Sequence, residues 1–183
     1  MSDDGLLQAR AAAVRLIVFD VDGVLTDGGL YYGPEGEALK RFGVKDGHAI
    51  VMARLVGLPC AILTARTSRQ VEVRGAELKL AAVLQGQRDK NAGLAALLAQ
   101  LEVPAEAVAY MGDDTNDLGP LATVGLPACP ADAVAEAREA ALFVSRNPGG
   151  HGAARELIEL VLKARGLWTQ ALAHVGAPVP REG

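Results

Sequence analysis

The sequence has few of the residues that mark several large classes of protein. Aromatic residues make up only 4 % of its 183 residues, and the two cysteines stand far apart, at Cys60 and Cys129, which excludes a disulfide scaffold. Basic side chains are not in excess, since 18 lysines and arginines stand against 22 acidic residues, and this excludes a basic nucleic-acid binder. No apolar run approaches the ~18 residues that a membrane-spanning helix needs.

The first residues and the cysteines indicate where in the cell the protein is found. The first residues, 1–4, read Met-Ser-Asp-Asp and are acidic, where a secretion signal would be basic. Two cysteines without a CxxC pair fit two small buried hydrophobes in a reduced protein. We therefore expect a cytoplasmic protein that contacts neither membranes nor nucleic acid.

Half of the residues are hydrophobic, and with so few aromatics the core must consist mainly of Ala, Val, Leu and Ile, as in parallel sheets covered by helices. Short apolar runs alternate with longer amphipathic stretches, which predicts βαβ units and an α/β fold with a doubly wound, mainly parallel sheet. The expected strands are 16–19, 60–63, 82–84, 108–111, 126–128 and 142–144, and the expected helices are 46–55, 68–78, 90–101, 118–123, 133–140 and 152–165. We expect one catalytic domain over residues 1–165 and a C-terminal tail over 166–183.

One segment, residues 29–42, interrupts the alternation. It holds the turn-forming tetrad Gly-Pro-Glu-Gly at 33–36 between two extended runs, which predicts an inserted β-hairpin. Tyr31, Tyr32 and Phe42 place half of the six tyrosines and phenylalanines on this hairpin. Two interpretations stay open: another subunit covers the hairpin, or the hairpin lies flat on its own sheet.

Reactive side chains follow the ends of four expected strands. In chain order they are Asp20 and Asp22, then Thr64, then Lys90 at the start of a helix, then Asp113, Asp114 and Asp117. The carboxyl ends of parallel strands meet at one edge of a sheet, so we expect these groups in one crevice. Each like-charge pair there costs roughly 3 kcal/mol at ~5 Å and an effective dielectric constant of ~20, so the five carboxylates need a cation. Oxygen ligands without His or Cys favour a hard ion, most simply Mg²⁺.

The pattern also indicates the chemistry. Asp20 could attack a phosphorus atom while Asp22, two residues on in an extended segment, gives a proton to the departing oxygen. Thr64 and Lys90 suit the nonbridging phosphoryl oxygens, and Gly23 lets the backbone approach the phosphate closely. Each piece alone has a plain structural reading, such as a solvated loop or a surface lysine. Their order along the chain makes a phosphoryl-transfer site the better hypothesis.

The four motifs, DVDGV, the threonine of LTAR, Lys90 and GDDTND, resemble those of the haloacid dehalogenase superfamily of phosphotransferases. The resemblance implies that Asp20 is the nucleophile and Asp22 the general acid and then the general base. It also implies Mg²⁺ held by the Asp20 carboxylate, the Asp22 backbone carbonyl and Asp113. The remaining acidic residues, Asp114 and Asp117, would complete the acidic site around those ligands.

Chain length points to one branch of that superfamily. Only 43 residues separate Asp20 from Thr64 and 25 separate Thr64 from Lys90, so no cap domain fits. DVDGVLTDG, the hairpin, VKDG, QGQ, VAYMGDD and GGHGAARE resemble the capless 3-deoxy-D-manno-octulosonate 8-phosphate phosphatase family. This resemblance implies a homotetramer in which hairpins pack between subunits and a C-terminal tail can reach a neighbour's site. It also implies hydrolysis of that sugar phosphate for lipopolysaccharide precursor synthesis.

Four residues are expected to bind substrate: Gly23, Ala65, Arg66 and Arg74. In the family resembled, arginine after the second motif accompanies octulosonate enzymes and glutamate accompanies nine-carbon enzymes. A guanidinium also suits the carboxylate of a keto acid. The alternatives are that Arg66 pairs with a neighbouring acid and that Arg74 is a solvated helix residue.

Several points stay open at this level. Asp46 is either a helix N-cap or a ligand contact, and Lys45 and His151 depart from the residues usual in the family. The substrate could instead be a nine-carbon keto-sugar acid 9-phosphate. Two non-enzymatic alternatives are a phospho-receiver domain, which lacks a second Asp two residues after its acceptor, and an inactive scaffold.

Overall fold

The computed structural model describes residues 3–176 and confirms the expected α/β architecture. A six-stranded sheet has the order β5-β4-β1-β6-β7-β8, and every neighbouring pair in it is parallel. Its strands are β1 (Leu16–Phe19), β4 (Cys60–Leu63), β5 (Ala82–Leu84), β6 (Val108–Met111), β7 (Leu126–Cys129) and β8 (Phe143–Val144). The first four strands have the bounds expected from the sequence, and the last two differ by one residue.

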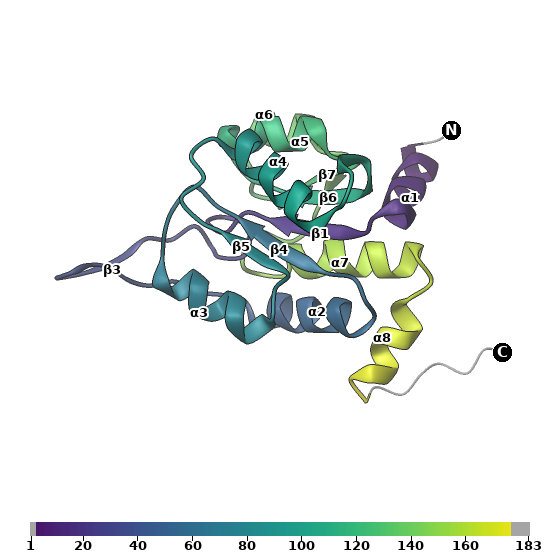
Figure 1. The fold of residues 1–183 in the computed structure, drawn as a ribbon, viewed down its shortest axis with the longest axis horizontal. Coiled ribbons are helices and arrows are strands. Elements are labelled where there is room, and N and C mark those ends of the chain that lie inside the picture. Colours follow the sequence, from purple (N-terminus) through teal and green to yellow (C-terminus); the bar gives the residue numbers. More distant parts are fainter. Residues whose placement is uncertain (1–2, 177–183) are drawn as a thin grey trace.

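Helices cover both faces of the sheet (Figure 1). On one face lie α2 (Val44–Leu55), α3 (Arg69–Leu78) and α7 (Ala153–Ala164), and on the other lie α4 (Lys90–Leu101), α5 (Leu118–Thr123) and α6 (Ala135–Ala140). Strand β1 shows why its apolar run is unbroken. Ile17 and Phe19 pack into the core on one face, while Leu16 and Val18 pack into the core on the other, and all four are fully buried.

Two helices were not expected. Helix α1 (Asp3–Ala13) precedes the sheet and packs against α7, and α8 (Trp168–His174) packs against α2 and α7. The expected tail is therefore helical over 168–174, where Ala171 is fully buried and Lys163 lies 5.1 Å from the ring centroid of Trp168. A helix of two turns carries too few apolar residues to show a period. The rest of the expected tail, 177–183, lies outside the described residues.

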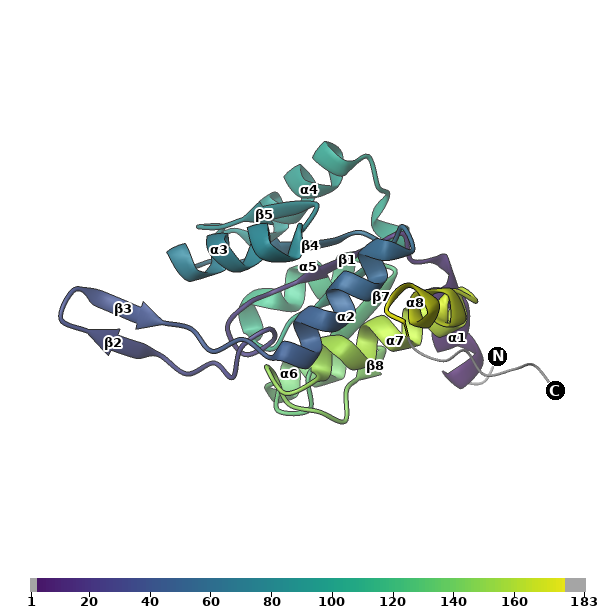
Figure 2. The ribbon, with the colours of Figure 1, turned by 90° about the horizontal axis from the view of Figure 1, so that it is seen from below.

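The inserted hairpin is formed by β2 (Tyr31–Gly33) and β3 (Gly36–Leu39), which pair in an antiparallel sheet of their own. Figure 2 shows it extending away from the body of the molecule rather than lying on the main sheet. Its apolar side chains are open to solvent, with Tyr32 64 % and Leu39 50 % exposed. The flat interpretation of the hairpin is therefore wrong.

The topology sets the place of any ligand site. From β1 the chain adds β4 and β5 on one side of the sheet and then returns to add β6, β7 and β8 on the other side. The direction in which strands are added therefore reverses at β1. Ligands of such sheets bind beyond the carboxyl ends of the strands at this reversal. Within the described part of the chain, the hairpin is the insertion between β1 and α2, and no cap domain covers this edge. None of the described helices has the length and apolarity needed to cross a membrane.

Candidate active site

A cavity of about 240 Å³ lies at the carboxyl ends of β1, β4 and β6. It is lined by Asp20, Asp22, Gly23, Gly28, Thr64, Ala65, Arg66, Asp113, Asp114 and Asn116. Eight of the eleven residues expected in the site therefore line one cavity. Lys90 and Asp117 contact Asp20 and Asp113 from the buried side, and Arg74 lies elsewhere.

Three carboxylates form the acidic centre of this cavity. Asp20, Asp113 and Asp117 each place one oxygen within 4.8 Å of the others. Burial raises the pKa of Asp20 to about 6, although the ammonium of Lys90 opposes the shift. Burial, together with the charges of Asp20 and Asp117, raises the pKa of Asp113 to about 7. Grouped carboxylates with raised pKa values are the electrostatic signature of a site that takes a cation.

The donor atoms fit a hard metal ion. Oδ1 of Asp20 is buried and has no hydrogen-bond partner among the described residues. Asp117 is different, because its Oδ1 accepts from Lys90 and from Tyr110, each at 2.5 Å, and its Oδ2 accepts the amide of Asp113 at 3.1 Å. Asp20 and Asp113 thus have oxygens available for a metal, whereas both oxygens of Asp117 already accept hydrogen bonds from neighbouring residues.

Lys90, the first residue of α4, holds the nucleophile candidate. Its Nζ lies 2.7 Å from Oδ2 of Asp20 and 2.5 Å from Oδ1 of Asp117. Burial alone would lower the pKa of Lys90, but the charges of Asp20 and Asp117 outweigh it and raise the pKa. The carboxylate of Asp89 accepts the amides of Asn91 and Ala92 and so fixes the start of this helix. Lys90 therefore remains a cation beside Asp20.

Gly23 brings the loop after β1 against the acidic centre. It has a φ of +82°, and a Cβ added there would lie 2.0 Å from Oδ2 of Asp113. The hydroxyl of Thr26 closes the same loop by donating to the carbonyl of Val21 at 3.1 Å. A second glycine-rich loop supports it from outside, since a Cβ on Gly149 would lie 1.8 Å from the Gly23 carbonyl oxygen. Only glycine fits at this contact between the two loops.

Asp22 belongs to a second group of charges, which we call the charge quartet: Asp22, Glu37, Lys40 and Arg66. Lys40 Nζ pairs with Oδ1 of Asp22 and lies 3.2 Å from Oε2 of Glu37. Arg66 Nη2 lies 2.7 Å from the same Glu37 oxygen, and Arg66 Nε lies 3.6 Å from Oδ2 of Asp22. The four charges alternate in sign around a closed ring. Arg66 thus pairs with neighbouring acids and also lines the cavity.

Sequence reasoning missed three residues that shape the site. In the sequence, Glu37 and Lys40 belong to the expected hairpin, and their spacing of three residues is the signal that could point to charges at its base. In the sequence, Tyr110 is one residue of an expected apolar strand. Its hydroxyl gave no separate signal before the position of Asp117 was known.

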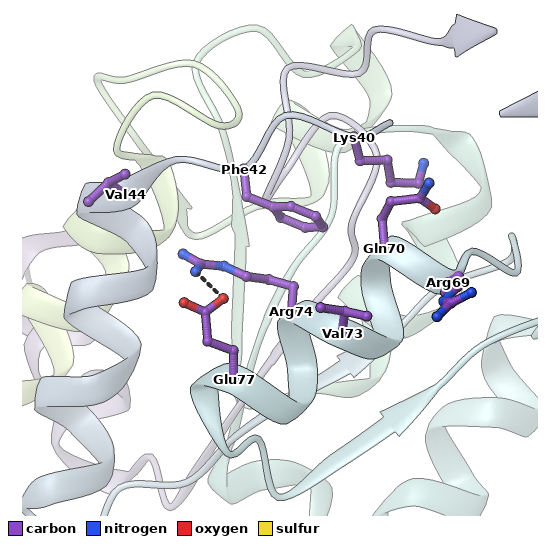
Figure 3. A pocket seen from close by; sticks show the side chains of 8 residues that line it. All are labelled: Lys40, Phe42, Val44, Arg69, Gln70, Val73, Arg74 and Glu77. Carbon is purple, nitrogen blue, oxygen red and sulfur yellow. Dashed lines mark hydrogen bonds and ion pairs between the residues drawn. The ribbon is translucent and has the colours of Figure 1, made fainter. Parts of the chain in front are cut away.

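Arg74 is not brought into this cavity. It lies on α3 and lines a larger cavity of about 480 Å³ between the hairpin base, α2 and α3 (Figure 3). Its Nη1 pairs with Glu77 at 2.8 Å, and its guanidinium carbon lies 5.9 Å from the ring centroid of Phe42. Two turns along α3 carry this side chain away from the strand ends where Arg66 lies. Arg74 therefore lines a different cavity from Arg66, and its contact with substrate stays a prediction.

The residues with open roles also lie outside the cavity. Asp46 is buried and caps α7, not its own helix, because it accepts the amides of Gly152 at 3.1 Å and Arg155 at 2.9 Å. His151 contacts the carbonyl of Gly149 and Nη1 of Arg41. Both residues contact the glycine-rich loop or its neighbours, outside the cavity.

Comparison with known proteins fits this geometry. The haloacid dehalogenase-like hydrolases match residues 60–157. A 3-deoxy-D-manno-octulosonate 8-phosphate phosphatase from Escherichia coli strain K12 is 42 % identical over 163 residues, which span 89 % of this chain and 87 % of that protein. The chain belongs to this phosphatase family of haloacid dehalogenase-like hydrolases.

Solved structures of the family have the same fold. The phosphatase of this name from Yersinia pestis has a TM-score of 0.86 at 40 % identity, covering 89 % of this chain and 88 % of that one. The phosphatase from Moraxella catarrhalis, in complex with a magnesium ion, a phosphate ion and a KDO molecule, has a TM-score of 0.90 at 32 % identity, covering 96 % of this chain and 99 % of that one.

Proposed function

We propose that this chain is a Mg²⁺-dependent phosphatase that hydrolyses 3-deoxy-D-manno-octulosonate 8-phosphate to the free sugar acid and inorganic phosphate. The reaction belongs to lipopolysaccharide precursor synthesis. The observation that carries the proposal is the Asp20 carboxylate, held by Lys90 on one oxygen and free on the other, at the edge of a cavity shared with Asp113. Membership of the phosphatase family supports the choice of substrate.

The carboxylates of Asp20 and Asp113 and the backbone carbonyl of Asp22 would hold Mg²⁺. When bound, the ion supplies positive charge that stabilises the phosphoryl oxygens. Asp117 positions Lys90 and the backbone amide of Asp113 around these ligands. Asp114, which caps the 3₁₀ turn Thr115–Asp117, fixes the loop that carries Asp113.

In the first step, an Asp20 oxygen attacks phosphorus and the bond from phosphorus to the sugar oxygen breaks. That sugar oxygen leaves with a proton from Asp22, and Asp20 carries the phosphoryl group. Lys90 and the hydroxyl of Thr64, which lies in the cavity wall, neutralise or hydrogen-bond the nonbridging oxygens.

In the second step, a water attacks the phosphorus of the aspartyl-phosphate. Asp22, now a carboxylate, takes a proton from this water, and the bond from phosphorus to the Asp20 oxygen breaks. Inorganic phosphate leaves, Asp20 is restored and Asp22 is protonated again. An acidic residue two positions after the nucleophile therefore serves both steps.

The sugar acid is proposed to bind at the rim of the cavity. Ala65 and Arg66 line that rim, and Arg66 is 41 % exposed, so its guanidinium can reach a carboxylate in solvent. A substrate carboxylate would compete with Glu37 for this guanidinium. A nine-carbon keto-sugar acid 9-phosphate is the alternative substrate, since it presents the same carboxylate and phosphate.

We further propose a homotetramer that forms through the hairpin. The hairpin extends from the body with Leu30, Tyr32 and Leu39 at least half exposed. These apolar side chains form a surface of the kind that protein partners cover. Size-exclusion chromatography with light scattering is expected to give a tetramer, and a stable monomer at micromolar concentration would contradict this proposal. Two buried, unpaired cysteines support a cytoplasmic setting.

A panel of sugar phosphates tests the function. Phosphate release is expected from octulosonate 8-phosphate with Mg²⁺, and the chelator or the Asp20→Asn substitution should abolish it. Asp4→Asn, at an exposed position of α1, serves as the matched control and should be fully active. Release that persists with chelator, or a fully active Asp20→Asn, would contradict the mechanism. A preference for nine-carbon substrates would overturn only the substrate. No turnover of any phosphate ester would favour the receiver or scaffold alternatives.

A further inference from the structure

Lys40 is a buried lysine with no part in the chemistry described so far. It follows β3 at the base of the hairpin, and its side chain is only 1 % exposed. Removing an ammonium from water is costly unless carboxylates compensate it closely. Asp22 and Glu37 provide that compensation, so the position of Lys40 and the positions of these two carboxylates depend on one another.

The two oxygens of Asp22 have different surroundings. Oδ1 pairs with Lys40, whereas Oδ2 is buried and has no hydrogen-bond partner among the described residues. Arg66 Nε lies 3.6 Å from Oδ2, beyond hydrogen-bond distance. Lys40 therefore anchors Oδ1 of Asp22. Because Asp22 lines the cavity, its Oδ2 is available to a ligand there.

We propose that Lys40 is the positioning residue of Asp22: it anchors Oδ1 so that Oδ2 exchanges the proton with the leaving oxygen. This inference rests on the phosphatase reaction proposed above. Lys40 acts through Asp22 and is not itself catalytic. Because Glu37 and Lys40 belong to β3 and its end, the hairpin base also helps to set the geometry of the acid.

The first step of the reaction distinguishes a positioning role of Lys40 on Asp22 from a role of Lys40 in the stability of the fold alone. A sugar alkoxide must receive a proton from Asp22 as the bond to phosphorus breaks, whereas p-nitrophenolate is stable enough to leave without one. The value of kcat/KM reports the reaction up to the loss of the leaving group. A displaced Asp22 therefore lowers kcat/KM for the sugar phosphate and has little effect on kcat/KM for p-nitrophenyl phosphate.

The experiment compares both substrates in wild type, Lys40→Met and Asp22→Asn. General acid catalysis contributes about 10²–10⁴-fold, so a mispositioned acid should lower kcat/KM for the sugar phosphate by roughly tenfold or more. For p-nitrophenyl phosphate the change should stay within about twofold, as for Asp22→Asn. Lys163→Met, which removes an exposed lysine paired with Glu159, is the matched control and should leave both substrates unchanged.

Two further variants distinguish a mispositioned Asp22 from a destabilised fold as the cause of lost activity. Lys40→Arg keeps the charge and should retain most activity on the sugar phosphate. Lys40→Met combined with Asp22→Asn should be no slower on the sugar phosphate than Asp22→Asn alone. Equal losses on both substrates, or additive losses in the double variant, would overturn the inference while leaving the proposed function intact. A wild type without turnover on either ester would overturn both.

Discussion

Asp113→Asn is expected to make the metal-free protein more stable at neutral pH, although it removes a proposed metal ligand. Burial and the charges of Asp20 and Asp117 raise the pKa of Asp113 from 3.8 to about 7 in the folded state. Between these values the folded protein holds a proton that the unfolded chain has lost. This contribution to stability is complete below pH 3.8 and disappears as the pH rises to about 7, where a buried charge remains.

The size of the effect follows from the shift. A difference of about three pKa units corresponds to about 4 kcal/mol at 1.36 kcal/mol per unit. Asp113 is partly exposed and its titration is linked to that of Asp20, so we expect a gain of about 1–2 kcal/mol for the variant at pH 8. At pH 5 only about a third of this difference should be present, because the unfolded carboxyl has already lost its proton there while the folded one still holds it.

Urea unfolding with chelator at pH 5 and pH 8 measures this difference. Asp114→Ala, one residue along, removes the side chain that caps the 3₁₀ turn and should lower stability at both pH values, which makes it the matched control. Mg²⁺ should then stabilise the wild type by mass action and leave Asp113→Asn nearly unchanged. A variant no more stable than wild type at pH 8, or one that gains equally at both pH values, would refute the electrostatic reasoning.

Three other substitutions have distinct expected outcomes. Glu156→Gln should lower the free energy of unfolding by about 1–3 kcal/mol at pH 7, because this carboxylate accepts hydrogen bonds from Ser145 Oγ at 2.7 Å and from the side chain of Arg146 at 2.6 Å. Burial alone would raise the pKa of Glu156, but these hydrogen bonds outweigh it and lower the pKa, so unfolding curves of the two proteins should converge as the pH falls below 4.5. Thr64→Val should lower kcat by about 10²-fold, while Tm changes little. Gly23→Ala should weaken Mg²⁺ binding in isothermal titration calorimetry, because the added Cβ would lie 2.0 Å from an Asp113 oxygen at a φ of +82°; unchanged affinity would contradict the packing described.

Most of the fold could be predicted because its signals are local. The buried apolar run of β1 is visible in a few neighbouring residues. Helix α8 gave no such signal, since its burial depends on contacts with α2 and α7 that only the folded chain makes. The projecting hairpin could be located by its turn, but its direction depends on how its base, at the Thr26–Phe42 bridge, is fixed.

The candidate site likewise has a part that could be predicted from the sequence and a part that could not. The convergence of Asp20, Thr64 and Asp113 follows from the topology of a parallel sheet, and the structure places them together. The charge quartet could not be foreseen, because Lys40 and Glu37 reach Asp22 only through the three-dimensional course of the hairpin. The position of Arg74 could not be foreseen either: Arg66 precedes α3 and Arg74 lies on that helix, and the two side chains line different cavities.

The claim that Asp20 is the nucleophile is tested most directly by trapping the phosphorylated enzyme. In Asp22→Asn, p-nitrophenolate can leave without a proton, but no base activates the water of the second step. Rapid mixing with p-nitrophenyl phosphate and Mg²⁺ is expected to give a burst of nitrophenolate equal to the enzyme concentration. Mass spectrometry of the acid-quenched protein should then place the phosphoryl group on Asp20. Nitrophenolate release without a burst and with Asp20 unmodified would contradict the mechanism.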